Sequence, residues 1–352
     1  MGVETIDITG FLKLREQLPV MDVRSPGEFS HAHIPGAYPL PLFSDEERKI
    51  VGTTYKQKSR EHAIKAGLDF FRMRPMLEEA EKLIIKHPLS DGSMNRSVIV
   101  HCWRGGMRSG AVAWLLGLYG FNVYVLAGGY KAFRRWALGQ FERNYNFQML
   151  GGYTGSGKTL LLHALKNKGH QVLDLEKLAS HRGSAFGALG QPAQPTQEMF
   201  ENVVALNLAH FTSHEPVWVE DESQRIGVLT IPHPLWNTMR EKPVHFIDVP
   251  FENRLENILQ EYGSFESSKI IEAILRIQKR LGPKETKDAI GFLLEGNTRE
   301  AFAILLSYYD KFYNKALFNR INAEEKINKI SCSGVDTEAN IKKLLSCLQK
   351  PA

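Results

Sequence analysis

Short apolar runs alternate with segments of helical periodicity along the first part of the chain. Four runs have the length and β-rich composition of buried strands, namely Pro19–Val23, Tyr38–Leu40, Ser97–His101 and Val123–Leu126. Between the second and third runs, Asp69–Lys86 carries apolar residues at helical spacing, and a helix is expected from about Ser109. This alternation predicts a mostly parallel sheet covered by helices.

A second series of strands and helices begins near Phe147. Its expected strands are Phe147–Leu150, Gln171–Leu175, Pro216–Glu220, Val244–Val249 and Lys326–Ser331. Residues 252–320 have a mainly helical pattern, and the Gly-, Ala- and Pro-rich stretch Ser180–Pro195 predicts a loop over a site. The two series meet within Trp136–Asn146. We therefore expect an α/β domain over residues 1–138 and a second α/β domain over 139–352, helical from about 252 onward.

The stretch Gly110–Tyr130 has no charged residue, which raises the question of a membrane span. Gly117, Gly120 and Asn122 interrupt it, so a buried helix followed by a buried strand explains it better. The first ten residues contain two acids and no apolar run, which argues against a signal peptide. The sequence thus predicts a cytoplasmic protein with no membrane segment.

Composition narrows the class of protein further. Hydrophobic residues make up 43% and charged residues 24% of the 352, as in ordinary globular proteins, and three cysteines exclude a disulfide scaffold. The net charge of +5 arises entirely in residues 1–140, with 19 Lys+Arg against 14 Asp+Glu, because the remainder holds 25 of each. This distribution excludes a nucleic-acid-packaging protein with positive charge spread along the whole chain. It is compatible with a local binding site for a polyanion.

One basic stretch, Arg48–Arg74, accounts for this excess. It holds eight basic residues against Glu61 and Asp69, a net charge of +6, and it also carries Tyr55, Phe70 and Phe71. Basic residues interleaved with aromatic ones suit contacts with an RNA backbone and stacking on its bases, although a solvated helix face is the alternative. The candidates for RNA contact, within an insertion over about residues 44–75, are Lys56, Lys58, Arg60, Arg72 and Arg74.

A cysteine follows the predicted strand Ser97–His101 and precedes a helix. In that position the backbone N–H groups and the helix dipole lower the pKa of the Cys102 thiol and favour the nucleophilic thiolate. Arg104 and Arg108 add positive charge, and Gly105 and Gly106 allow the backbone amides to converge on an anion. Cys332 and Cys347 have no such surroundings and are expected to be structural.

The segment Gly152–Thr159 matches the phosphate-binding pattern G-x4-G-K-[ST] and lies between a predicted strand and a predicted helix. The backbone from Gly155 through Ser156 and Gly157 would wrap a phosphate, Lys158 would neutralise its outer oxygens, and Thr159 would reach a Mg²⁺ ion. The pattern predicts a site for a diphosphate group without specifying what that group is attached to.

Several charged residues are predicted to lie around this phosphate loop. Asp221 follows the strand that ends at Glu220 and is the best candidate for a magnesium partner. Asp174 and Glu176 end an earlier strand at the same sheet edge, where α/β proteins bind ligands, so Asp174 is a further candidate for acid–base or magnesium chemistry. Arg182 lies in the predicted loop and could reach a substrate phosphate. His31 and His33 are too weak a pair to indicate a metal site, and no metal site is assigned with certainty.

Two stretches near the N-terminus, Asp22–Phe29 and His31–Ala37, resemble the opening signature of rhodanese-like domains, in which a cysteine at the position of Cys102 carries sulfur or selenium. We expect Arg24 and Glu28 within them to form a local structural pair. The spacing from Cys102 to Arg108 is Cys-x5-Arg, one residue longer than the common rhodanese loop, and it also matches the loop of cysteine phosphatases.

The two loops in this order, together with the strings Asp174–Glu176, His181–Ser184 and Phe186–Gly187, resemble the bacterial tRNA 2-selenouridine synthases over about residues 5–330. The resemblance implies a rhodanese-like domain followed by a P-loop NTPase-like domain. It further implies transfer of a geranyl group from geranyl diphosphate to the wobble 2-thiouridine of tRNAs for Lys, Glu and Gln. Selenophosphate then supplies the selenium of 2-selenouridine, with Cys102 carrying it and the P-loop holding diphosphate.

On this reading no tightly bound cofactor is expected, although Mg²⁺ could assist at the phosphate loop. The expected partners are the anticodon region of tRNA, selenophosphate and the enzyme that could supply it. Three alternatives remain open at this point. The chain could be an ATP-dependent rhodanese-type sulfurtransferase, or a cysteine phosphatase-like module fused to a kinase-like domain. The third alternative, an RNA-binding adaptor without activity, is disfavoured by two intact anion loops.

Overall fold

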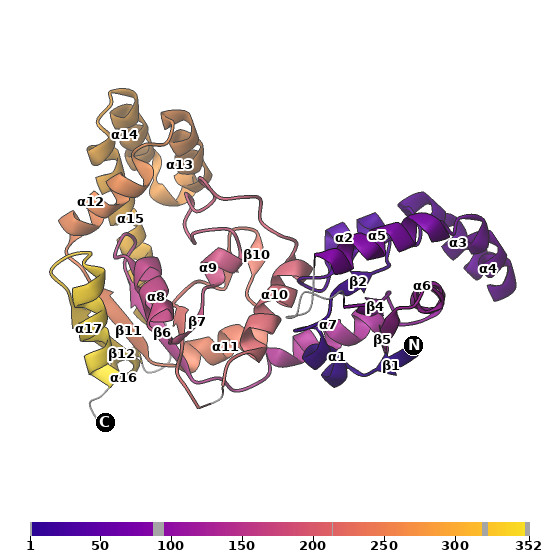
Figure 1. The fold of residues 1–352 in the computed structure, drawn as a ribbon. Coiled ribbons are helices and arrows are strands. Elements are labelled where there is room, and N and C mark those ends of the chain that lie inside the picture. Colours follow the sequence, from indigo (N-terminus) through magenta and orange to yellow (C-terminus); the bar gives the residue numbers. More distant parts are fainter. Residues whose placement is uncertain (1, 87–94, 213, 319–322, 349–352) are drawn as a thin grey trace. The chain divides into compact units, whose positions relative to one another are not determined.

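The computed structural model describes residues 2–86, 95–212, 214–318 and 323–348 (Figure 1). The chain forms two compact units, one of residues 1–140 with 201–203 and the other of residues 141–200 with 204–352. The division after Gln140 coincides with the end of helix α7 (Gly129–Gln140), two residues beyond the expected boundary.

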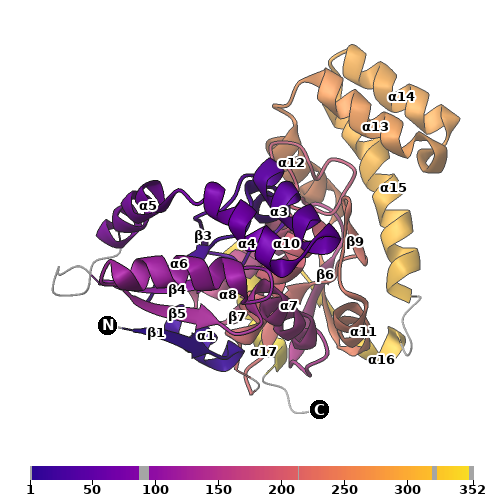
Figure 2. The same ribbon diagram turned by 90° about the vertical axis from the view of Figure 1, so that its right-hand side faces the viewer.

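The first unit contains a five-stranded sheet whose paired strands are all parallel, in the order β1-β5-β4-β2-β3. The strands are β1 (Val3–Ile6), β2 (Val20–Asp22), β3 (Tyr38–Pro39), β4 (Ser97–His101) and β5 (Asn122–Leu126). Figure 2 shows α6 (Met107–Leu118) and α1 (Ile8–Leu14) on opposite faces of this sheet. The uncharged stretch therefore forms a buried helix and a buried strand, as its pattern predicts.

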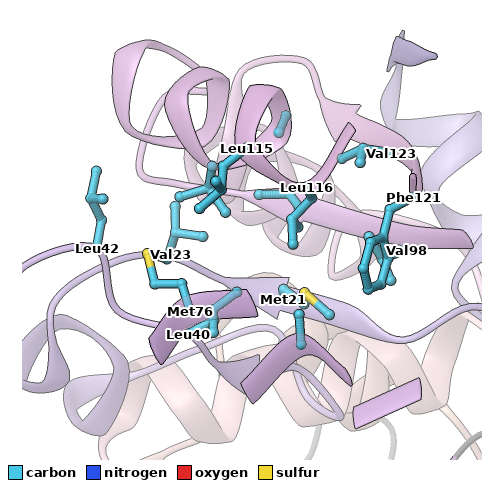
Figure 3. Close-up of a cluster of buried hydrophobic side chains, with 14 of the residues drawn as sticks. Met21, Val23, Leu40, Leu42, Met76, Val98, Leu115, Leu116, Phe121 and Val123 are labelled. Carbon is cyan, nitrogen blue, oxygen red and sulfur yellow. The ribbon is translucent and has the colours of Figure 1, made fainter. Parts of the chain in front are cut away.

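The core of this unit lies between the sheet and the helices α5 (Met73–Ile85) and α6. Figure 3 shows Met21 from β2 and Val98 from β4 meeting Leu115 and Leu116 of α6 and Met76 of α5. All five side chains are buried, which fixes β4 and the start of α6 relative to one another. The loop that joins these two elements carries the cysteine.

The insertion consists of α3 (Asp45–Gln57), α4 (Arg60–Asp69) and the start of α5. The helix predicted over Asp69–Lys86 exists as α5 but begins only at Met73, because α4 ends at Asp69. Pro75 explains the later start, since a proline has no N–H for a helical hydrogen bond and is tolerated only in the first turn. Ser44 and Ser59 cap α3 and α4 by accepting hydrogen bonds from backbone N–H groups of their first turns.

The second unit contains a parallel sheet in the order β12-β11-β6-β8-β7. Its strands are β6 (Phe147–Gly152), β7 (Gln171–Leu173), β8 (Val217–Glu220), β11 (Val244–Asp248) and β12 (Ile327–Ser331), and β9 (Arg225–Ile226) pairs separately with β10 (Leu229–Thr230). Helices α8 (Lys158–Asn167) and α17 (Thr337–Leu348) contact each other beside this sheet. The five strands predicted for this part all exist, with ends shifted by a few residues.

The expected helical part is formed by α12 (Phe251–Tyr262), α13 (Ser267–Leu281), α14 (Pro283–Leu294) and α15 (Thr298–Phe318), which share a core of their own. The last two positions of the predicted helical stretch, 319–320, lie outside the described residues. The remaining helices are α2 (Pro26–His31), α9 (Leu175–Leu178), α10 (Gln197–Ala209), α11 (His233–Glu241) and α16 (Ala323–Lys326). Among the helices described, none combines the length and apolar character needed to cross a membrane.

Candidate functional site

The cysteine loop joins the end of β4 to the start of α6. Cys102 is only 3% exposed, and its Sγ accepts a hydrogen bond from the Gly106 N–H at 3.3 Å and lies 3.3 Å from the Ser109 hydroxyl. Gly105 has φ +63°, and a Cβ there would lie 2.5 Å from the carbonyl oxygen of Leu126, so the tight loop requires glycine. The sulfur is thus held at the N-terminus of α6, with backbone amides directed toward it.

This arrangement favours the thiolate. Burial by itself raises the pKa of the Cys102 thiol, but hydrogen bonds from the Ser109 hydroxyl and from the N–H groups of Gly106, Ser109 and Arg104 outweigh burial and lower that pKa. Ser109 thus helps to lower the pKa of Cys102, a role that is not evident from its position directly after Arg108 in the sequence. The site has the electrostatic character of a nucleophilic cysteine.

The two arginines of the loop differ in their surroundings. Arg104 is exposed, whereas Arg108 donates to Glu28, with Nη1 and Oε2 2.6 Å apart. The expected Arg24–Glu28 pair is wrong, because the buried Arg24 instead pairs with Asp22 at 2.6 Å. Asp22 lies two residues from Arg24 and Glu28 lies four residues away, and Glu28 is engaged by Arg108 of α6.

The Arg108–Glu28 pair predicts a pH-dependent stability. Partial burial raises the pKa of Glu28. The hydrogen bond from Arg108 and the positive charge of Arg108 outweigh burial and lower this pKa to about 2. A carboxylate with a lowered pKa stabilises the fold above about pH 4.5 and loses that effect as the pH falls toward 2. Glu28→Gln should therefore destabilise the first unit by about 1–2 kcal/mol at pH 7, allowing for solvent screening.

Hydrogen exchange of the β4 and α6 amides measures this loss, which should shrink between pH 4.5 and 3. Glu79→Gln is the control, because Glu79 pairs with Lys82 on an exposed helix face. Equal protection of wild type and Glu28→Gln at pH 7 would contradict the role assigned to this pair.

A cavity of about 800 Å³ lies beside the cysteine, between the cysteine loop and the insertion helices α3 and α4. Apolar side chains form most of its wall, and Cys102, Trp103 and Met107 line it from the loop side. The insertion therefore covers the reactive cysteine, a relation that sequence spacing alone could not reveal. Phe70 and Phe71 are partly buried against the core of the unit, and Phe71 also lines this cavity.

The basic residues of the insertion are exposed, as RNA contact requires. Lys56, Lys58 and Arg60 are exposed around the junction of α3 and α4. Arg74 pairs with Glu78 on an exposed face of α5, whereas Arg72 makes two hydrogen bonds to the carboxylate of Glu47. The structure thus leaves the first three with the greatest freedom to contact phosphate and engages Arg72 in holding α5 to α3.

The phosphate loop connects β6 to α8 in the second unit. Lys158 Nζ donates to the carbonyl oxygen of Gly152 at 2.8 Å, and Asn257 donates to the carbonyl of Gly155 at 3.1 Å. Gly155 has φ +81°, and a Cβ there would lie 2.7 Å from the carbonyl oxygen of Arg254. Ser156 is 1% exposed, and its hydroxyl has no hydrogen-bond partner within the described chain. Gly157 lies in the left-handed region at φ +80° and leads directly into α8.

Carboxylates surround the hydroxyl of Thr159, but not those that the sequence favoured. Thr159 donates to Glu220 at 3.0 Å and to Glu176 at 3.5 Å. Asp221 accepts a hydrogen bond from Tyr313 at 3.3 Å and lines a cavity in front of the phosphate loop, while Asp174 caps α9 and lies 3.0 Å from His163.

Burial, followed by repulsion from neighbouring acids, raises the pKa of both Glu176 and Glu220. One oxygen of Glu220 has no hydrogen-bond partner in the described residues, although the side chain is fully buried. Glu220 was missed because a strand-terminal acid inside an apolar run gives no signal of its own. In the described chain no three His, Cys, Asp or Glu side chains form a metal site by themselves.

A cavity of about 1690 Å³ opens in front of the phosphate loop. Lys158 and Thr159 line one side, and Arg182 lies at the rim, paired with Glu261. Apolar and aromatic side chains also line it, and among them the Tyr313 hydroxyl accepts a hydrogen bond from the Gly152 N–H; they are Trp236, Ile258, Tyr262, Tyr309, Phe312 and Tyr313. The cavity can thus hold an anionic group at the loop and an apolar or planar group against these side chains.

Comparisons with known proteins match both parts of the chain. The family model described as the tRNA 2-selenouridine synthase AAA domain matches residues 145–340, and the rhodanese-like domain model matches residues 9–135. A Nitrosomonas europaea protein described as tRNA 2-selenouridine synthase is 39% identical over 69% of this chain and 63% of its own length. Proteins of the same description from Hydrogenovibrio crunogenus and Psychromonas ingrahamii are 36% and 30% identical over 77% and 92% of their lengths, and over 76% and 91% of this chain.

Proposed function

Because the chain belongs to the tRNA 2-selenouridine synthase family, we propose that it converts the wobble 2-thiouridine of tRNAs for Lys, Glu and Gln to 2-selenouridine through an S-geranyl intermediate. The observation that carries this proposal is the pairing of two anion-binding loops in one chain. One loop presents a thiol with a lowered pKa, and the other is a phosphate loop in a large, partly aromatic cavity.

The first step is alkylation of the thiouridine sulfur. That sulfur attacks the first carbon of geranyl diphosphate, the carbon–oxygen bond breaks, and diphosphate leaves with the bonding electrons. Lys158 and the backbone amides of Gly155–Lys158 stabilise the departing charge. Alkylation matters because a neutral thiocarbonyl sulfur is a poor leaving group, whereas an alkylated sulfur leaves as a thiol.

Magnesium fits the donor set around Thr159. The Thr159 hydroxyl and the carboxylates of Glu220 and Glu176 are hard oxygen ligands, and one Glu220 oxygen is buried without a partner. Mg²⁺ bound there would neutralise charge on the diphosphate, whose own oxygens would complete the coordination. We infer no other cofactor.

The second step replaces the geranylated sulfur with selenium from selenophosphate, with Cys102 as the selenium-carrying nucleophile. A selenopersulfide on Cys102 forms an Se–C2 bond, and the C2–S bond breaks to release geranyl thiol. Loading selenium onto the thiol forms the S–Se bond and breaks the Se–P bond of selenophosphate. Water takes the phosphoryl group, which leaves as phosphate, and a disulfide takes up the two electrons that are removed. A cellular thiol returns two electrons when the S–Se bond is cut. The enzyme that supplies selenophosphate is a proposed partner.

One assay tests the whole proposal. The full-length protein is incubated with 2-thiouridine tRNA, Mg²⁺, geranyl diphosphate, selenophosphate and a thiol–disulfide buffer, and the nucleosides are then analysed by mass spectrometry. We expect S-geranyl-2-thiouridine followed by 2-selenouridine. Absence of both nucleosides would overturn the proposal, and turnover that depends on ATP in place of geranyl diphosphate would favour an ATP-dependent transferase.

The proposed tRNA contact makes a separate prediction. The double variant Lys56→Ala/Arg60→Ala should bind substrate tRNA about tenfold more weakly at 0.1 M salt and show a shallower salt dependence of affinity, because two phosphate contacts are lost. The control is Lys284→Ala/Lys287→Ala, which removes two exposed charges from α14. Filter binding across a salt series measures both, and equal slopes for wild type and the first variant would contradict this contact.

A further inference from the structure

We infer that the apolar cavity beside Cys102 holds the geranyl chain of the S-geranylated uridine during the selenium step. The inference rests on the proposed function and adds to it a binding site for an isoprenoid chain in the rhodanese-like domain. It is distinct from the phosphate-loop cavity, where geranyl diphosphate would be bound as a donor.

The composition of the cavity wall is the first argument. Val51 of α3, Ala63, Ile64 and Leu68 of α4, and Phe71 after α4 all line it. Ile64 and Leu68 remain 41% and 59% exposed, so apolar surface faces solvent here although a buried position would be more favourable. The volume of about 800 Å³ lies in the range of sites that enclose small organic ligands.

The other reactants of the selenium step do not account for such a wall. Selenophosphate is a small, highly charged anion that needs only the backbone amides around Cys102 and nearby positive charge. The tRNA backbone is a polyanion, and it is matched by the basic residues at the same cavity, among them Arg48, Lys56, Arg60 and Arg104. The geranyl chain is the one component of the reaction whose transfer from water to this wall would be favourable.

The position of the cavity is the second argument. The geranyl chain is attached through sulfur to C2 of the uridine, which is the carbon that the selenium on Cys102 must reach. When the Se–C2 bond forms and the C2–S bond breaks, the sulfur leaves with the bonding electrons and is protonated to geranyl thiol. A substrate placed for this reaction therefore has its chain starting one atom from the reacting carbon, next to the cavity that Cys102 itself lines.

Two isoleucines on the insertion provide a matched test. Ile64 lines the cavity at 41% exposure, whereas Ile50 of α3 is 50% exposed and does not line it. Ile64→Asp and Ile50→Asp are compared in the full-length protein, with anticodon stem-loops that carry either S-geranyl- or S-methyl-2-thiouridine. Conversion of each stem-loop to 2-selenouridine is measured with selenophosphate, thiol and disulfide present.

We expect Ile64→Asp to lower kcat/KM for the S-geranyl substrate at least tenfold and to change that for the S-methyl substrate less than twofold, with Ile50→Asp close to wild type for both. If Ile64→Asp does not fold, as judged by circular dichroism, Leu68→Asp takes its place. Equal loss on both substrates, or no loss, would overturn the inference. A wild-type protein that converts neither substrate would instead overturn the proposed function, so the two failures are distinguishable.

Discussion

Replacement of Cys102 by alanine is expected to abolish formation of 2-selenouridine, by at least about a thousandfold, while S-geranyl-2-thiouridine accumulates. The reason is that, in the function proposed above, the selenium step uses the thiolate held by Gly106 and Ser109, whereas alkylation takes place at the phosphate loop of the other unit. Nucleoside mass spectrometry after incubation with all substrates measures both products in one sample.

Cys347→Ala is the matched control, because Cys347 is exposed on α17 and should be replaceable without loss of either product. A circular dichroism melt of Cys102→Ala checks that the buried site tolerates the change. Loss of both nucleosides in a folded Cys102→Ala protein would contradict the assignment of the selenium step to the first unit and of alkylation to the second. Full selenation by that variant would show that selenium reaches C2 without this cysteine.

The second large effect is expected at the phosphate loop. Lys158→Ala should raise the dissociation constant for geranyl diphosphate by about 30-fold or more, since a buried contact between an ammonium group and a diphosphate is worth at least about 2 kcal/mol. In the structure Lys158 Nζ donates to the carbonyl oxygen of Gly152, so the ammonium group is already held at the loop. Isothermal titration calorimetry with geranyl diphosphate and Mg²⁺ measures the change.

Lys166→Ala on the same helix is the control, because Lys166 is exposed in the last turn of α8 and does not line the cavity. The affinity of Lys166→Ala for geranyl diphosphate should equal that of wild type. An unchanged affinity of Lys158→Ala for this ligand would mean that geranyl diphosphate binds elsewhere. Loss of S-geranyl nucleoside with retained selenation of a pre-geranylated tRNA would further assign Lys158 to the first step alone.

Local patterns were sufficient to predict much of the fold. The strand Ser97–His101 is reproduced with both ends correct, and the phosphate-loop segment lies between a strand and a helix as its motif requires. These features depend on short-range physics, namely apolar runs that form buried strands and glycine-rich turns that lead into helices. The family itself was recognisable from two such loops and is confirmed by the family models.

Other features depended on partners distant in sequence. Glu28 lies four residues from Arg24 but pairs with Arg108, 80 residues away, because ion pairs form between the side chains that packing brings together. Glu220 lies beside Thr159, 61 residues away in the chain, only because β8 pairs with β6. No periodicity in the sequence encodes such a choice between equally charged candidates.

The sequence by itself therefore determined the two-domain α/β architecture, the cysteine loop and the phosphate loop, since each arises from contiguous residues whose local geometry is almost fixed. The tertiary structure alone decided that the basic insertion covers the cysteine and encloses an apolar cavity with it. The reason is that Ile64 and Cys102, 38 residues apart in the chain, line one cavity only because the insertion helices pack beside the cysteine loop, and packing of that kind is selected by the burial of the whole core.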